Sequence, residues 1–150
     1  MQLSKRLQAV ADYVTPGSRV ADIGCDHAHT SIYLATNKIA DYAIAMDINK
    51  GPIQRANENI EKYRCTEKIE TRLSDGARKL KSDEVDTILI SGMGGALIVK
   101  ILSESFQVVD KAKELILQPQ SEWRLVREYL HGIGFCIVKE NMLNEDGKYY

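Results

Sequence analysis

The sequence predicts an α/β fold with a doubly wound, mostly parallel sheet whose last strand is antiparallel. Short apolar segments typical of strands alternate with stretches in which apolar residues recur at helical spacing. This alternation is typical of β-α-β units, whose strands run parallel. Near the end of the chain, Glu145-Asp146-Gly147 predicts a hairpin turn, so the strand that begins at Lys148 is expected to be antiparallel.

The size of the chain predicts one domain over residues 1–150, because 150 residues with 44% hydrophobic content suffice for a single core. The last strand stops at Tyr150, so we expect a sheet truncated at the C-terminus. No apolar run approaches the roughly 20 residues of a bilayer span, and residues 1–6 do not resemble a secretory signal, so a cytoplasmic location without membrane attachment is expected. The three cysteines lack Cys-x-x-Cys spacing, which predicts reduced thiols and no metal site.

Apolar spacing and turn residues give the predicted element boundaries. Leu3, Leu7, Val10 and Val14 share one face of a first helix. The predicted strands cover residues 19–23, 42–47, 69–73, 86–90, 114–118 and 135–138. The later predicted helices cover about residues 27–37, 52–63, 96–102 and 122–131, the last one with Ser121 as its N-cap.

The charges are unevenly distributed although the net charge is −1. Residues 50–81 hold nine Lys and Arg against five Asp and Glu, whereas residues 82–122 hold three against seven. The basic segment is either a rim for phosphate contacts or an ordinary solvated helix face, and Arg124 and Arg127 allow the same two interpretations.

The first candidate site follows the first buried strand, in the segment Val20 to Ala28. Gly24 ends this strand and lets a ligand approach the backbone. Neither G-x-G-x-x-G nor a P-loop is present, and Asp26 would repel a phosphate while attracting a cation. S-adenosylmethionine carries a sulfonium and an ammonium and no phosphate, so Asp22 and Asp26 fit it better than they fit NAD. Strand-to-helix packing, or a metal held by Cys25-Asp26-His27-Ala28-His29, are the weaker interpretations.

Two further acids follow the next two predicted strands. Asp47 lies 23 residues after Gly24, close to the offset at which an acid bonds ribose hydroxyls in a nucleotide-binding β-α-β unit. Asp75 follows the third strand, where it either accepts the exocyclic amine of an adenine or is a plain turn acid.

The second informative segment is Ser91-Gly92-Met93-Gly94-Gly95, between the fourth strand and a helix. Its three glycines indicate that something approaches the backbone closely, and Met93 is a candidate apolar wall for a flat ring. The alternative is a tight turn with Met93 in the core. In open α/β sheets ligands bind at the carboxyl ends of strands beside the switch point, which predicts one crevice for the first and fourth strand ends.

Four segments together resemble the bacterial tRNA (adenine-N1)-methyltransferase family that modifies adenine 22, a class I S-adenosylmethionine-dependent group with a Rossmann-like sheet. The matching segments are Val20 to Ala28, Ile90 to Gly95, Leu117-Gln118-Pro119 and Glu145 to Tyr150. The chain departs from the family pattern at His29-Thr30-Ser31 and at Gln120. The family also carries a C-terminal helical extension, which we expect to be absent from residues 1–150.

The resemblance, together with the strand-end positions described above, implies a role for each candidate residue. The implied cofactor-binding residues are Asp22, Gly24, Asp26, His27, Asp47, Ile48, Asp75, Gly76, Gly92, Met93 and Gly94. The implied substrate-binding residues are Gly94, Gln118 and Pro119, and Gln120 is a further candidate although it departs from the family pattern. The implied catalytic residues, which would face the reacting adenine, are Asp26, Ser91, Gly92 and Met93.

The implied reaction needs no general base, because adenine N1 carries a free lone pair at neutral pH. Positioning of nitrogen, methyl and sulfur should therefore dominate catalysis, and the base must be turned out of its stack. The chain lacks the Asn/Asp-Pro-Pro-Tyr/Phe motif of exocyclic-amine methylation and a cysteine after proline, as pyrimidine C5 methylation requires. A methyltransferase acting on a small molecule or a protein, and a non-catalytic cofactor-binding module, stay open.

Overall fold

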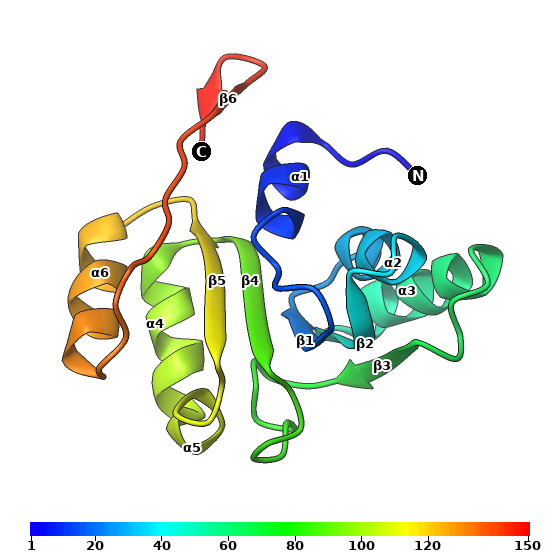
Figure 1. Ribbon diagram of the computed structural model, residues 1–150, viewed down its shortest axis with the longest axis horizontal. Helices are drawn as coiled ribbons and strands as arrows, with labels where there is room; N and C mark the ends of the chain where they lie inside the picture. The colour runs from blue at the N-terminus through cyan, green and yellow to red at the C-terminus, as the bar shows by residue number, and fades with distance from the viewer.

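A single parallel sheet forms the centre of the computed structural model, which describes residues 1–150 (Figure 1). Its five strands have the order β3-β2-β1-β4-β5. The bounds of these strands are β1 Ser18–Ile23, β2 Ala40–Asp47, β3 Ile69–Leu73, β4 Thr87–Met93 and β5 Glu114–Pro119. The chain moves from β1 outward to β3 and then returns to the other side of β1 to form β4, so the predicted doubly wound topology is confirmed.

Helices cover both faces of the sheet. Their bounds are α1 Lys5–Ala11, α2 His29–Thr36, α3 Lys50–Lys62, α4 Gly95–Glu104, α5 Phe106–Val109 and α6 Trp123–Gly132. Alternate strand residues enter separate cores, as parallel strands buried on both sides require. Ile88 and Ile90 pack in one cluster with Ile98 of α4, whereas Leu89 packs with Val10 of α1 on the other face.

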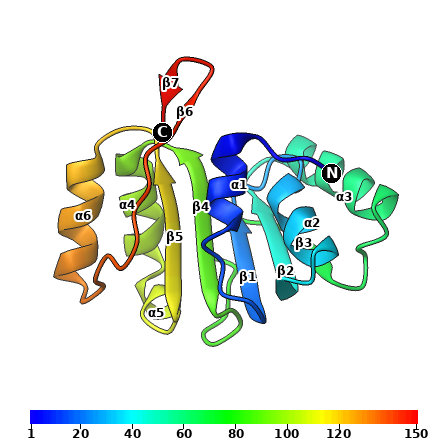
Figure 2. The same ribbon diagram turned by 45° about the horizontal axis from the view of Figure 1, so that its top comes forward.

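The last strand is antiparallel, as predicted, but it pairs outside the main sheet. Strands β6 (Asn144–Glu145) and β7 (Lys148–Tyr149) form a separate two-stranded hairpin. Figure 2 shows this hairpin above the carboxyl ends of β4 and β5, close to α1. The Glu145 carboxylate accepts hydrogen bonds from the backbone N–H groups of Lys5 and Arg6, at 2.7 and 3.2 Å.

Three predicted details are wrong. Residues 135–138 form no strand, because no neighbouring strand pairs with their backbone, and Val138 is 84% exposed. Ser121 does not cap α6: the N-cap is Glu122, in the left-handed conformation and without a side-chain capping bond. Strand β4 runs on through Met93, so Ser91 and Gly92 belong to the strand end and only Gly94 separates it from α4.

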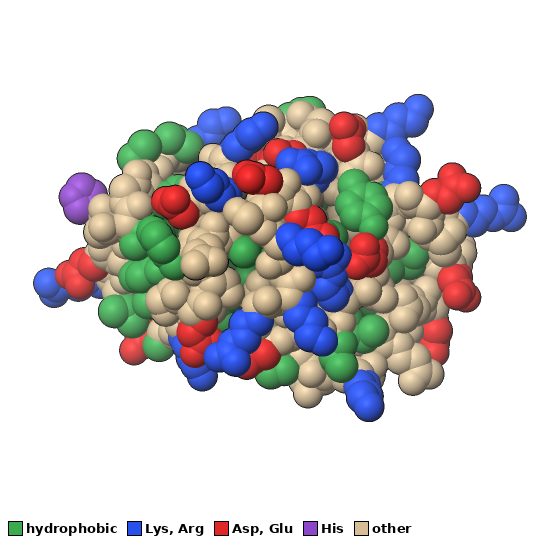
Figure 3. Space-filling view, turned by 90° about the horizontal axis from the view of Figure 1, so that it is seen from below, with side chains coloured by type: hydrophobic (Ala, Val, Ile, Leu, Met, Phe, Trp, Pro, Cys, Tyr) green, Lys and Arg blue, Asp and Glu red, His purple; other side chains and the backbone are tan.

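Several arginines of the basic segment 50–81 form ion pairs with carboxylates of the same protein. Arg72 binds Glu70 and Glu84 at 2.7 and 2.8 Å, and Arg78 binds Glu104 at 3.0 Å. On the face shown in Figure 3, Lys and Arg side chains intermingle with Asp and Glu. Arg72 and Arg78 therefore already have carboxylate partners within the fold. This weakens the interpretation of the whole segment 50–81 as a rim for phosphate contacts. No helix combines the length and apolarity that crossing a membrane would demand.

The Arg72–Glu84 pair should make the fold sensitive to acid. Hydrogen bonding to Arg72 lowers the pKa of Glu84 from 4.5 to about 2. The pair therefore stabilises the fold above pH 4.5, and this stability is lost as the pH falls through the folded-state pKa. Because the pair is partly solvated, we expect Glu84→Gln to lower the free energy of unfolding by only about 1–2 kcal/mol at pH 7.

Urea unfolding at pH 7 and near pH 2 measures this effect. The difference between Glu84→Gln and wild type should shrink at the lower pH. Glu67→Gln is the matched control, because Glu67 is exposed and makes no hydrogen bond or ion pair. A pH-independent loss in Glu84→Gln would show that the ion pair is not the cause.

Candidate functional site

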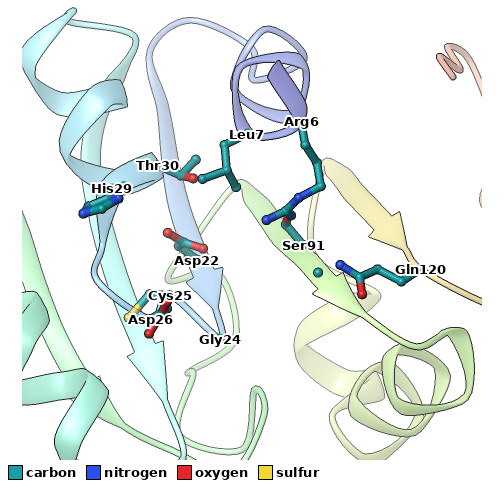
Figure 4. Close-up of a pocket in the computed structure, with 11 residues that line it drawn as sticks. Arg6, Leu7, Asp22, Gly24, Cys25, Asp26, His29, Thr30, Ser91 and Gln120 are labelled. Atoms are coloured by element: carbon teal, nitrogen blue, oxygen red, sulfur yellow. The ribbon is translucent and has the colours of Figure 1, made fainter. Parts of the chain in front are cut away.

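A cavity of about 240 Å³ lies at the carboxyl ends of β1 and β4, where the strand order reverses (Figure 4). This is the position at which open α/β sheets bind ligands. Six predicted site residues line it: Asp22, Gly24, Asp26, Ser91, Gly92 and Gln120. Five residues without a predicted role complete the wall: Arg6, Leu7, Cys25, His29 and Thr30. The predicted crevice between the first and fourth strand ends is therefore present.

Gly24, which follows β1, packs against Met93 at the end of β4. Its φ is +76°, and a Cβ built on it would lie 2.3 Å from Met93 Cε. The N–H groups of Gly24 and Cys25 both donate to the carbonyl oxygen of Met46, which anchors the turn to β2 at 2.8 and 2.9 Å. Met93 thus packs against the glycine turn and is not part of the cavity lining.

The acids of the cavity have contrasting environments. Asp22 is 4% exposed, and burial raises its pKa from 3.8 to about 6, although a 2.7 Å hydrogen bond from Ser31 Oγ opposes this rise. Asp26 is exposed, with a φ of +51°, and lies 3.6 Å from His27 and 3.9 Å from Arg55. A positive φ at a non-glycine residue costs roughly 1–3 kcal/mol, and residues with such a backbone conformation tend to cluster at functional sites.

Asp47 and Asp75 lie farther along the same sheet edge. They follow β2 and β3, and the Ser74 N–H donates to the Asp47 carbonyl oxygen at 2.9 Å, which holds the two strand ends together. Asp47 Oδ1 accepts from the Asn49 N–H at 3.0 Å, while Asp75 lies 3.6 Å from Arg78. Both acids are outside the cavity lining. Each acid nevertheless follows the strand that the sequence predicts, and β1, β2 and β3 are neighbours in the sheet.

The other predicted residues do not line the cavity. Ile48 is 59% exposed beyond β2, and Gly76 packs close to Ile101 of α4. The ring of His27 lies 5.4 Å from that of His29. The carbonyl oxygen of Pro119, the last residue of β5, accepts a 2.9 Å hydrogen bond from Trp123 Nε1 at the start of α6.

Gln118 fixes the ends of β4 and β5 to each other. Its Oε1 accepts from the Gly92 N–H at 2.9 Å and from Arg6 Nη1 at 2.9 Å. Arg6 Nη1 also donates to Ser91 Oγ at 2.7 Å. Gly94 lies close to Ser121, 3.1 Å from built Cβ to Oγ. The loop after β5 therefore forms one wall of the site together with β4.

Sequence reasoning missed Arg6. Its guanidinium reaches the cavity from α1, a helix that the sequence shows only as a packing element. No local motif marks it, since its partners Ser91 and Gln118 are 85 and 112 residues away. Among His, Cys, Asp and Glu residues, no group of three or more is arranged to hold a metal ion.

The fold and the site together define an α/β protein of the Rossmann-like class with an acid-lined cavity at its switch point. A family model described as "Methyltransferase domain" matches residues 3–150. The chain belongs to this family and, within it, to the tRNA (adenine(22)-N1)-methyltransferases, which confirms the resemblance predicted from its motifs.

The relatives that support this assignment come from several bacteria. The chain is 41% identical over 150 residues to the tRNA (adenine(22)-N(1))-methyltransferase of Bacillus subtilis, covering 100% of this chain and 63% of the relative. It is 26% identical to a putative tRNA methyltransferase of Mycoplasma genitalium, covering 95% of this chain and 65% of that relative. The chain thus spans less than two thirds of these relatives.

Solved structures give the same result. A putative tRNA (m1A22) methyltransferase of Streptococcus pneumoniae, in complex with S-adenosyl-L-methionine, is 40% identical with a TM-score of 0.96, over 99% of this chain and 70% of that one. The B. subtilis m1A22 tRNA methyltransferase TrmK is 43% identical with a TM-score of 0.93, over 99% of this chain and 64% of that one.

Proposed function

We propose that this protein transfers a methyl group from S-adenosylmethionine to N1 of an adenine in tRNA, at position 22 as in its Bacillus relative. The observation that carries the proposal is the cavity at the switch point, which two carboxylates line and which has no phosphate-binding glycine motif. In this proposal residues 1–150 form one methyltransferase domain that acts in the cytoplasm.

The residues of the cavity fit the proposed donor in charge and in shape. Asp22 and Asp26 offer negative charge to a sulfonium and an ammonium, whereas they would repel a pyrophosphate. Gly24 lines the cavity and carries no side chain, so no Cβ stands between its backbone and a bound donor. Bound there, the donor supplies a methyl group activated by the positive charge on sulfur.

Other residues along the sheet edge complete the proposed cofactor site. In this proposal Asp47, at the end of β2, accepts hydrogen bonds from the ribose hydroxyls, and the exposed Ile48 offers apolar surface beside it. Asp75 and Gly76, which follow the neighbouring strand β3, are the proposed contacts of the adenine. His27 and Gly94 complete the set.

The carboxyl ends of β4 and β5 form the proposed target-base side. Ser91, Gly92 and Gln120 line the cavity, while Gln118 fixes the β4 backbone and Pro119 holds the loop. The chain has no need to remove a proton from adenine N1, so its task is to hold the base in line with the methyl group and to exclude water. Carbonyl groups near Ser91 and the carboxylate of Asp26 would stabilise the positive charge that the ring gains.

The target nucleotide must leave its stack before N1 becomes accessible, because N1 lies on the pairing edge. The proposal therefore includes an RNA contact surface around the cavity. A labelled donor incubated with unmodified tRNA tests the reaction. Label mapped to adenine N1 supports it, whereas label on a protein or a small molecule, or donor binding without any transfer, would favour the two other classes.

The Asp47 assignment predicts a specific loss of donor affinity. Removal of a charge-assisted hydrogen bond to ribose in Asp47→Ala should weaken binding of S-adenosylmethionine roughly tenfold or more. Isothermal titration calorimetry measures this directly. Asp41→Ala is the matched control, because Asp41 is an exposed acid near the opposite end of the same strand. Equal affinities of Asp47→Ala and wild type would remove Asp47 from the site.

A further inference from the structure

Arg6 is the single lysine or arginine among the residues that line the cavity. Its guanidinium is part-buried, and Nη1 donates only to neutral oxygens, those of Ser91 and Gln118. None of the protein's ion pairs includes Arg6. A partly desolvated cation without a counter-ion is unfavourable, so this position favours an anionic ligand group.

Arg6 is held in place by contacts to both its side chain and its backbone. Nη1 is fixed by the ends of β4 and β5, and the ring of Tyr150 lies 5.6 Å from the guanidinium carbon, in the range of a cation–π contact. The Glu145 carboxylate binds the backbone N–H of Arg6 itself. Nε and Nη2 donate to no protein acceptor, which leaves N–H groups of the planar fork available to bind a carboxylate.

We propose that Arg6 binds the α-carboxylate of the methyl donor, an inference that rests on the function proposed above. The charges of the lining mirror those of the donor. Asp22, Asp26 and Arg6 contribute two negative charges and one positive charge, while S-adenosylmethionine carries two positive groups and one carboxylate. Each charged group of the donor thereby has an opposite partner in one cavity.

A nucleic-acid phosphate is the less suitable anion for Arg6. Asp22 and Asp26 line the same cavity, and they would repel a separate phosphate. The carboxylate of the donor belongs to a molecule that also carries an ammonium and a sulfonium, and these two positive charges offset its repulsion by Asp22 and Asp26. Arg6 would thereby select donors that retain the carboxylate.

Binding of two donors to two variants tests this assignment. Calorimetry would compare S-adenosylmethionine with decarboxylated S-adenosylmethionine on wild type, Arg6→Met and Lys5→Met. Wild type should prefer the intact donor about tenfold or more, which is the expected effect of one charge-assisted contact. Arg6→Met should lose this preference and bind the decarboxylated donor within about twofold of wild type. Lys5→Met is the control, because Lys5 is exposed, adjacent in sequence and makes no side-chain contact.

Three outcomes would overturn the assignment. Absence of a preference in wild type does so without any variant, even if Arg6→Met does not fold. An equal loss for both donors in Arg6→Met would show that Arg6 only supports Ser91 and Gln118. An unchanged donor affinity with a raised KM for tRNA and a weaker salt dependence would assign Arg6 to a phosphate. Wild type that binds neither donor would instead refute the proposed function itself.

Discussion

Asp22→Asn should cost the protein its methyl donor and yet make the fold more stable. At neutral pH the wild-type carboxylate faces the cavity as a nearly buried negative charge, and its proposed partner is a cationic group of the donor. Replacing this charge by a neutral amide of similar shape should weaken donor binding roughly 10- to 100-fold. The hydrogen bond with Ser31 Oγ can persist, because the amide oxygen is also an acceptor.

The gain in stability follows from the raised pKa. Below about pH 4 the Asp22 carboxyl is protonated in both the folded and the unfolded chain. Between about pH 4 and 6 only the unfolded chain loses its proton, because burial raises the folded-state pKa from 3.8 to about 6. The stability of wild type therefore falls as the pH rises through this window, by up to about 3 kcal/mol. Asp22→Asn should lack this fall and exceed wild type by about 1–3 kcal/mol at pH 8.

Thermal unfolding and calorimetric titration of the donor at pH 5 to 8 check both effects. Wild-type affinity should decline below about pH 6 as Asp22 gains its proton, whereas the affinity of the variant should be flat. Asp41→Asn, which removes an exposed carboxylate, should change neither quantity. A variant that keeps wild-type affinity would show that Asp22 does not contact the donor.

The sequence does not predict that the charge of Asp22 lowers the stability of the fold while it favours donor binding. The strand pattern places Asp22 in a buried strand, and the acid-bearing turn suggests a cationic ligand. The degree of burial depends on α2, because Ser31 must return to the strand to bind Asp22. Local patterns predict the strand, the turn and the acids near the ends of the first three strands, whereas the energetic cost arises from contacts between elements.

Arg6 illustrates the same limit more strongly. Helical periodicity predicts that Leu7 and Val10 face the protein core, but it does not predict which residues the Arg6 side chain contacts. Only the packing of α1 on β4 and β5 brings its guanidinium to Ser91 and Gln118. The strand predicted at residues 135–138 is wrong for a related reason, because an apolar run becomes a strand only where another strand pairs with it.

The glycines after β4 also have a different cause from the one that the sequence suggests. Their clustering predicts that something approaches the backbone, and a ligand was the natural candidate. At Gly95 the approaching group is the protein itself: a Cβ there would lie 2.5 Å from the Ser121 carbonyl oxygen and 2.7 Å from that of Glu122. The Gly95 N–H also donates to Ser121 O at 3.0 Å. This glycine therefore joins α4 to the loop before α6.

Gly95→Ala should consequently cause a large loss of stability and of methyl transfer. The opposing atoms are backbone carbonyls, which have no rotamer to change, so α4 and the loop must separate. We expect the free energy of unfolding to fall by about 2–3 kcal/mol, the upper range of overpacking effects. For a domain of this size the Tm should fall by roughly 4–12 °C. Movement of the loop would displace Gln120 from the cavity, so transfer should decrease more than donor binding at a temperature where the variant is folded.

Gly132→Ala provides the matched control for this prediction. Gly132 is the last residue of α6, and a Cβ there meets no atom within 4 Å, so alanine should stabilise the helix by roughly 0.5–1 kcal/mol. The two variants add the same methyl group and should shift the Tm in opposite directions. Equal Tm values for Gly95→Ala and wild type would mean that the contact at Ser121 and Glu122 yields easily, and the loop would then be free to move independently of α4. In that case Gly95 would be required for close approach of a ligand to the backbone. Gly95→Ala would then lose affinity for the donor or the substrate without any loss of stability.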